Sequence, residues 1–184
     1  MYIKKTLTAL ILGSCAVSNA SHGTVITDSN SYSINGVDSF VSAYNHAIVN
    51  LNVGADVAFL DMHDQSHVNL YAGELSWLNL FDQSTADIHG IDISWLLMGG
   101  DSIANIYGSD FSYAGGHLSG KWSDGSLFSF WALNIDSNGQ ITTPSPTSIP
   151  VNISLHSVPT PGTLYLLGAA LLPLLGFHQK LSYA

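Results

Sequence analysis

Four side chains suited to metal or acid–base chemistry lie within one short stretch, Asp61, His63, Asp64 and His67. On a helix, His63 and His67 would share a face and could bind a metal ion. In a strand the four-residue separation places them about 13 Å apart. We therefore predict a solvated junction between elements here, and no metal site.

Acidic residues recur at a fixed distance along the chain, Asp64 with Asp82 and Asp92 with Asp110, and both pairs have the same spacing (82 − 64 = 18 and 110 − 92 = 18). If these carboxylates are stacked about 5 Å apart, they repel each other unless a cation lies between them. Weak calcium binding is therefore an alternative that stays open. Carboxylates of glycosidases lie roughly 5 to 9 Å apart, so a polysaccharide-active enzyme is a second alternative.

Other catalytic signatures are missing from the sequence. It contains neither a nucleophile elbow nor a Ser-His-Asp order, and it has no arginine to stabilise an anion. The segment from Asp136 to Gly139 resembles a fragment of a calcium loop but lacks the closing glutamate. An Asx turn explains this segment. We predict that the protein is not an enzyme and uses no cofactor.

Aromatic residues share the same spacing, because Trp77, Trp95 and Tyr113 follow one another at equal intervals (95 − 77 = 18 and 113 − 95 = 18). Buried rings at these positions would pack a core. Exposed rings would form a platform on which sugar rings stack. Both interpretations stay open, and these three residues are the candidate sugar-stacking row.

The elements that position these residues are repeats. Residues 64–113 contain one pattern three times, marked by Ser66, Ser84 and Ser102. Such a period indicates a stack of supersecondary units, none of which buries its apolar face alone.

Apolar residues alternate within each repeat, which is typical of strands, and glycines at 73, 90 and 108 separate two such runs as corners. We predict an all-β fold, a short β-solenoid of 18-residue coils spanning residues 21–113. A β-sandwich is the alternative. Equivalent residues would stack about 4.8 Å apart, forming a polar ladder of Asn69, Asp87 and Asn105. His89 falls at or next to the position of Tyr71 and Tyr107.

A fainter coil precedes these three. Residues 49–60 match residues 68–78 if one residue is inserted at Ala55 or Asp56. Residues 34–40 resemble a degenerate terminal coil.

Residues 114–157 have a different pattern, which predicts a hairpin cap and a proline-rich linker. The Asp-Gly pair in the turn 123–126 separates two apolar runs and is a strong hairpin signal. The cap would cover the open end of the stack. Residues 151–155 would return as one more strand.

Composition indicates an exported protein. Of 184 residues only 9% are charged, compared with about 25% in typical globular domains. Residues 1–20 combine a basic start, a short apolar core and small residues before a cleavage site, as a secretory signal does. A lipoprotein signal ending at Cys15 is the alternative. Without residues 1–20, Lys121 and Lys180 face 13 acids, a charge of 2 − 13 = −11 that disfavours nucleic-acid binding.

The carboxyl end contains Val158, Pro159, Thr160 and Pro161, then an apolar run of about 15 residues, then His178 and Lys180. The run is shorter than the roughly 20 residues of a membrane span. Residues 158–184 resemble a PEP-CTERM sorting signal, with Thr160 in place of an acidic residue and a reduced basic cluster. The sorting motif would be Val158 to Pro161.

This resemblance implies a Gram-negative, polysaccharide-secreting bacterium. The C-terminal hydrophobic helix would anchor the chain transiently in the inner membrane until an exosortase-like sorting protease removes it. The chain would then reach the cell envelope or the extracellular matrix. We therefore expect a non-enzymatic surface or matrix protein associated with exopolysaccharide. A polysaccharide-active β-helix enzyme and a calcium-dependent adhesin are the alternatives.

Overall fold

The computed structural model describes residues 23–136, 138–142 and 148–159. These residues form strands, turns and loops, and among them no helix is long and apolar enough to cross a membrane. The fourteen strands are β1 (Gly23–Ile26), β2 (Ser31–Ile34), β3 (Val37–Ala43), β4 (Ile48–Leu51), β5 (Asp56–Met62), β6 (His67–Leu70), β7 (Glu74–Leu80), β8 (Thr85–Ile88), β9 (Asp92–Met98), β10 (Ile103–Ala114), β11 (His117–Lys121), β12 (Leu127–Ile135), β13 (Ile141–Thr142) and β14 (Ile153–Ser157). The predicted secretory signal and C-terminal hydrophobic helix lie outside the described residues.

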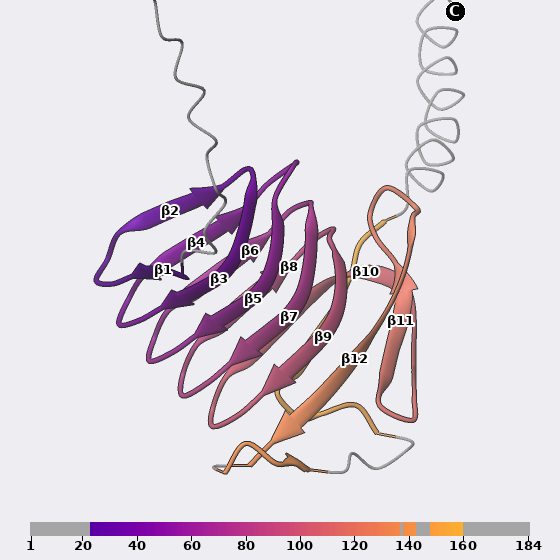
Figure 1. Cartoon of the computed structure of the whole chain (residues 1–184). Helices are drawn as coiled ribbons and strands as arrows, with labels where there is room; N and C mark the ends of the chain where they lie inside the picture. The colour runs from indigo at the N-terminus through magenta and orange to yellow at the C-terminus, as the bar shows by residue number, and fades with distance from the viewer. Residues whose placement is uncertain (1–22, 137, 143–147, 160–184) are drawn as a thin grey trace, which may run out of the picture.

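The strands wind into a β-solenoid of about five turns, as Figure 1 shows. Sheet A contains β1, β3, β5, β7 and β9 in parallel register, and sheet B contains β2, β4, β6 and β8. The predicted period is confirmed, because Trp77 pairs with Trp95 and Asn69 with Asp87. Parallel stacking of successive coils excludes the β-sandwich alternative.

The predicted insertion lies in the corner between β4 and β5. Before this corner, Leu51 pairs with Leu70 (70 − 51 = 19), whereas after it Asp56 pairs with Glu74 (74 − 56 = 18). The extra residue therefore lies within 52–55, which includes Ala55 and excludes Asp56. The predicted degenerate coil at 34–40 is a complete coil built from β2 and β3.

Apolar side chains from the two sheets meet inside the solenoid. Every second residue points inward along a strand, and equivalent inward residues of successive coils stack into rows. Several rows are completely buried, among them Val41, Leu60, Leu78 and Leu96 from sheet A and Leu51, Leu70, Ile88 and Ile106 from sheet B. Because these rows are unbroken, the core is continuous along the axis. Burial of each such side chain contributes roughly 1.5 to 3 kcal/mol.

Left-handed residues make the corner between each sheet A strand and the following sheet B strand. The equivalent positions have φ between 55° and 66° in five coils, Asp28, Asn45, Asp64, Asp82 and Gly100. Asp, Asn and Gly are the residues that adopt this conformation most readily. In three of these coils a serine follows two residues later and turns inward, and Ser66, Ser84 and Ser102 are all 0% exposed.

The third repeat departs from the prediction after Gly108. The chain does not turn a corner there, because Gly108 lies inside the twelve-residue strand β10. A Cβ atom at Gly108 would lie 2.5 Å from the carbonyl oxygen of Lys121 on the adjacent strand. This glycine therefore permits close approach of β11, and the predicted corner at 108 is wrong.

The carboxyl end of the solenoid is closed by the β11–β12 hairpin (Figure 1). β12 joins sheet A beside β9, and β10 pairs with both β11 and β8, so that the two sheets form one ribbon ordered from β1 to β2. The hairpin contributes four buried apolar side chains to the core, Leu118, Trp122, Phe128 and Phe130. β14 pairs with β10, so the strand predicted at 151–155 is present but begins two residues later, at Ile153.

Candidate functional site

A column of aromatic rings runs along the outer face of sheet A. The register places one ring on each of five neighbouring strands, Phe40, Phe59, Trp77, Trp95 and Trp131. Their successive centroids are 6.1, 6.0, 4.9 and 5.2 Å apart. We call these five residues the ring column.

The two tryptophan rings in the middle of the column are nearly parallel and overlap only in part. Trp77 and Trp95 are inclined by only 4° with centroids 4.9 Å apart. Van der Waals contact between parallel rings occurs at about 3.5 to 4 Å, so the two rings are displaced sideways by roughly 3 Å. Trp77 therefore covers only part of Trp95, whereas Phe40 and Phe59 are inclined by 38°. The two tryptophans therefore pack against each other and are partly exposed.

Tyr113 lies outside this column, contrary to its predicted equivalence with Trp95. It pairs with Leu118 in the β10–β11 hairpin, and its hydroxyl donates a hydrogen bond to the Ala132 carbonyl at 3.1 Å. Burial raises the pKa of Tyr113. The reason is that β10 continues past Gly108 as one strand, with a register shift between Ser109 and Ser112, and pairs there with β11 instead of β9.

Trp131 takes that position, and sequence reasoning missed it. One signal was present, because 131 − 95 = 36, twice the 18-residue period. The chain therefore runs for 36 residues, two repeat periods, between Trp95 and the next residue in its row of sheet A. His117 follows on the next strand, with its ring centroid 3.6 Å from that of Trp131.

A polar row runs beside the ring column on the same face. Asn79 donates a hydrogen bond from Nδ2 to Oδ1 of Asp61 at 2.7 Å. Beyond it a second set of rings is stacked, with His63 between Tyr44 and Phe81 at 4.7 and 4.8 Å. The outer face of sheet A therefore combines flat rings with hydrogen-bonding groups.

The two histidines of the first candidate cluster are separated by a corner. His63 stacks on sheet A, whereas His67 lies on β6 and bonds to Thr85 Oγ1 at 2.7 Å and Asn69 Oδ1 at 3.0 Å. Among the described residues, no three His, Cys, Asp or Glu side chains gather to hold a metal ion.

Sheet B carries the predicted polar ladder. Asn69 donates to Asn50 Oδ1 at 2.9 Å, and Asn105 donates to Asp87 Oδ1 at 2.8 Å. A third set of rings, on the side of sheet B, flanks this ladder. It consists of Tyr71, His89, Tyr107 and His156, and successive centroids are 5.4, 4.3 and 4.7 Å apart. His89 thus occupies a ring position of the repeat, as predicted.

The candidate acid pairs have different outcomes. Asp82 Oδ2 accepts a hydrogen bond from the Asp64 backbone at 3.1 Å, so this pair does stack at the corner. Asp92 lies beside Glu74 of the preceding coil and not beside Asp110. The carboxylate of Asp110 forms an ion pair with Lys121 at 2.8 Å. The predicted Asp92–Asp110 pair is therefore wrong, for the same reason as Tyr113.

The predicted Asx turn is present at the β12–β13 connection. The carboxylate of Asp136 accepts hydrogen bonds from the backbone of Gln140 and Asn138 at 2.9 and 2.8 Å. These bonds hold the pKa of Asp136 below its ordinary value. The hydrogen bonds of this carboxylate therefore stabilise its own turn.

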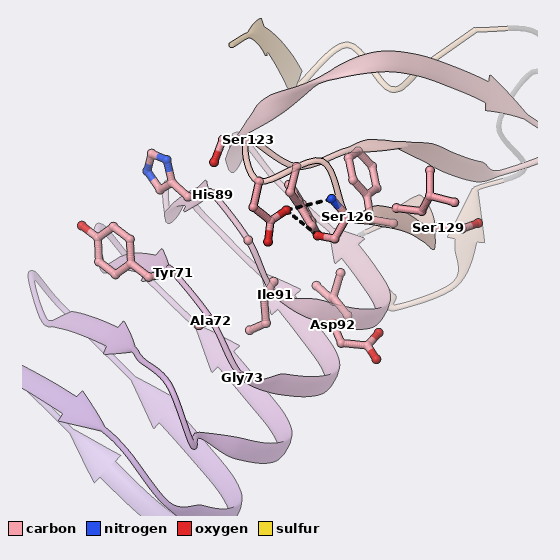
Figure 2. A pocket seen from close by; sticks show the side chains of 15 residues that line it. Tyr71, Ala72, Gly73, His89, Ile91, Asp92, Ser123, Ser126 and Ser129 are labelled. Atoms are coloured by element: carbon pink, nitrogen blue, oxygen red, sulfur yellow. Dashed lines mark hydrogen bonds between the residues drawn. The ribbon is translucent and has the colours of Figure 1, made fainter. Parts of the chain in front are cut away.

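A cleft of about 470 Å³ lies where the last solenoid corners face the hairpin turn. Figure 2 shows the rings of Tyr71 and His89 on the solenoid side and Ser123 and Ser126 on the hairpin side. Asp124 accepts bonds from the hydroxyl and the backbone N–H of Ser126 at 2.6 and 2.8 Å, which lower its pKa. The cleft therefore contains hydroxyl groups, ring surface and an ionised carboxylate.

The candidate sorting motif begins at the edge of the described solenoid. The backbone N–H of Val158 donates to the Gly108 carbonyl at 2.8 Å, and Pro159 is exposed. Thr160 and Pro161 lie outside the described residues.

Comparison with family models, with curated proteins and with solved structures finds no match for this chain.

Proposed function

We propose that the protein is an exported, non-enzymatic component of the cell surface or extracellular matrix that binds exopolysaccharide along the outer face of sheet A. The ring column carries this proposal. It runs across five adjacent strands in an unbroken line. A linear array suits a linear polymer, whose successive units can lie against successive rings.

The exposure of these rings supports this role. Phe40 and Phe59 are 41% and 39% exposed, and Trp77 and Trp95 are partly exposed. Sugar rings present apolar C–H faces to aromatic rings, while their hydroxyls need hydrogen-bonding partners. The carboxylate of Asp61, which also accepts a hydrogen bond from Asn79, provides such a partner beside the column. An exposed apolar patch of this kind on a protein surface usually marks an interaction site.

Charge restricts the class of polysaccharide. The chain carries 13 acidic residues and no arginine, and Lys121 is paired with Asp110. A polymer of uronic acids would be repelled by this surface. The proposed ligand is a neutral or amine-bearing polysaccharide.

Export and sorting belong to the same proposal. The signal at 1–20 directs export, and an exosortase-like protease acts at the motif from Val158 to Pro161 after transient anchoring in the inner membrane. Intact mass spectrometry of the chain from cell envelope and medium of the native host tests this part. We expect a species that starts at Ser21 and ends near Pro159, and a species that keeps residues 158–184 would contradict sorting.

Affinity electrophoresis tests the binding function. The purified exported chain is run in native gels that contain the exopolysaccharide of its host or none. We expect retardation by the polysaccharide that falls at least several-fold in Trp77→Leu and Trp95→Leu, because leucine keeps apolar packing but removes the ring.

Tyr71→Leu is the matched control, because Tyr71 is a 51% exposed ring at the end of the other ring set, on sheet B. Its retardation should equal that of the unmodified chain. Absence of retardation in the unmodified chain, or an equal loss of retardation in all three variants, would contradict polysaccharide binding by the ring column. Circular dichroism checks that each variant is folded.

A further inference from the structure

The two ends of the β-ribbon lie together at the amino end of the solenoid (Figure 1). β1 pairs only with β3, and β2 pairs only with β4. Within the described part of the chain, one side of each strand therefore presents unpaired backbone N–H and C=O groups. At the opposite end, the hairpin follows β9 through β12, and β14 is added beside β10.

Both edge strands are short, with four residues each, but they lack the other features that prevent pairing. Proteins protect exposed edges with short strands, lysine, proline, inward charges or bulges. The sequences Gly23-Thr-Val-Ile26 and Ser31-Tyr-Ser-Ile34 contain no charged residue and no proline. Their register to the neighbouring strands is continuous. Val25 and Tyr32 are 66% and 41% exposed, so the edge is regular, uncharged and accessible.

The length of chain before β1 identifies the occupant of this edge. If residues 1–20 are removed on export, as proposed above, only Ser21 and His22 precede β1. Two residues extend at most about 7 Å, which is too short to add a strand across the end. A second copy of the chain offers the same two edges at the same separation.

Symmetry makes the two copies compatible. Strands of sheet A run opposite to those of sheet B in a solenoid. A twofold axis perpendicular to the solenoid axis therefore brings edge strands together antiparallel, whichever sheet meets which. Antiparallel addition at an edge is a common mode of recognition, and a twofold interface uses the same surface on both copies.

We propose that the exported chain forms a head-to-head dimer in which β1 and β2 pair with the equivalent edges of a second copy. The two solenoids then form one continuous structure with a closing hairpin at each outer end. The inference rests on the proposed removal of residues 1–20. It adds a partner that the polysaccharide-binding function does not require.

The test compares three forms of the exported chain by size-exclusion chromatography with light scattering over a range of concentrations. Val25→Lys combined with Ser33→Lys places charge on both edges. Val53→Lys is the matched control, because Val53 is 83% exposed at a corner in the middle of the solenoid. We expect the unmodified chain and the control to dimerise, and the edge variant to dimerise at least tenfold more weakly.

A second measurement covers the case in which the edge variant does not fold. In the unmodified chain, amide hydrogen exchange of residues 23–34 should slow as protein concentration rises. Exchange of these residues that is independent of concentration would overturn the proposal.

Mass spectrometry of the same samples separates this inference from the proposed function. A monomeric chain that starts at Ser21 overturns the dimer and leaves export standing. A chain that keeps residues 1–20 overturns both. A dimer that persists unchanged in the edge variant shows an interface elsewhere and also overturns the inference.

Discussion

Asp124 shows how a single carboxylate can order a connection that has no core of its own. The residue is exposed at the β11–β12 turn, and its oxygen accepts both the backbone N–H and the hydroxyl of Ser126. These bonds favour the ionised carboxylate and hold its pKa below the ordinary value. The turn matters beyond itself because it forms one wall of the cleft.

The lowered pKa predicts a pH-dependent contribution to stability. A carboxylate with a folded pKa below its unfolded value stabilises the protein at pH above the unfolded pKa, which is about 3.9 for aspartate. This contribution disappears as pH falls through the lower folded pKa. Asp124→Ala should therefore lower Tm modestly at pH 7 and have little effect once the carboxylate is protonated.

Thermal unfolding of both forms between pH 7 and pH 2.5 measures this difference. Asp101→Ala is the control, because Asp101 is another exposed carboxylate at a turn. An equal loss of Tm for Asp124→Ala at both ends of the range would show that the hydrogen bonds to Ser126 do not depend on ionisation.

Corners decide whether the strands of each coil meet in register. Gly73 lies at the corner between β6 and β7, with φ of +107°, a conformation that L side chains rarely adopt. A Cβ atom there would lie 2.6 Å from the Ala55 carbonyl oxygen of the preceding coil. Close stacking of successive corners therefore requires glycine at this position.

Gly73→Ala should lower the free energy of unfolding by about 2 kcal/mol or more, because it combines an unfavourable φ with a clash against backbone. Gly36→Ala is the matched control. Gly36 also lies at a corner, but its φ is not positive and no atom lies within 4 Å of the added Cβ. Urea unfolding of both variants measures the difference, and equal effects would contradict the role assigned to Gly73.

The molecule as a whole has one closed end and one open end. Each coil contacts only its neighbours, so stability is close to a sum of coil and interface terms. The terminal strands β1 and β2 each have one neighbouring strand, whereas β8 lies between β6 and β10 and β9 lies between β7 and β12. Local opening should therefore begin at the amino end.

Amide hydrogen exchange of the edge variant Val25→Lys with Ser33→Lys tests this gradient without dimerisation. We expect protection to increase from β1 and β2 through β4 and β5 to β8 and β9. Exchange of all strands at one common rate would indicate a single cooperative unit and would contradict the gradient.

The repeat pattern alone was enough to predict the β-solenoid, the polar ladder and the alignment of Trp77 with Trp95, but not the face on which these rings lie. These features depend on an 18-residue period, and parallel stacking transmits any such period directly into spatial rows. Trp77 and Trp95 could be paired, and His89 assigned to a ring position, because their relation to neighbouring coils is local and repetitive.

The point at which the repetition ends could be found only from the folded chain. The third repeat matches the first two up to Tyr113, yet β10 continues as one strand past Gly108 because β11 approaches Gly108 and pairs antiparallel with β10 beyond that point. Trp131 consequently completes the ring column in place of Tyr113. Strand direction after a repeat depends on which edges compete for pairing, and that competition involves residues distant in sequence. The same long-range pairing joins the two sheets at the carboxyl end of the solenoid and leaves β1 and β2 as edges at the amino end.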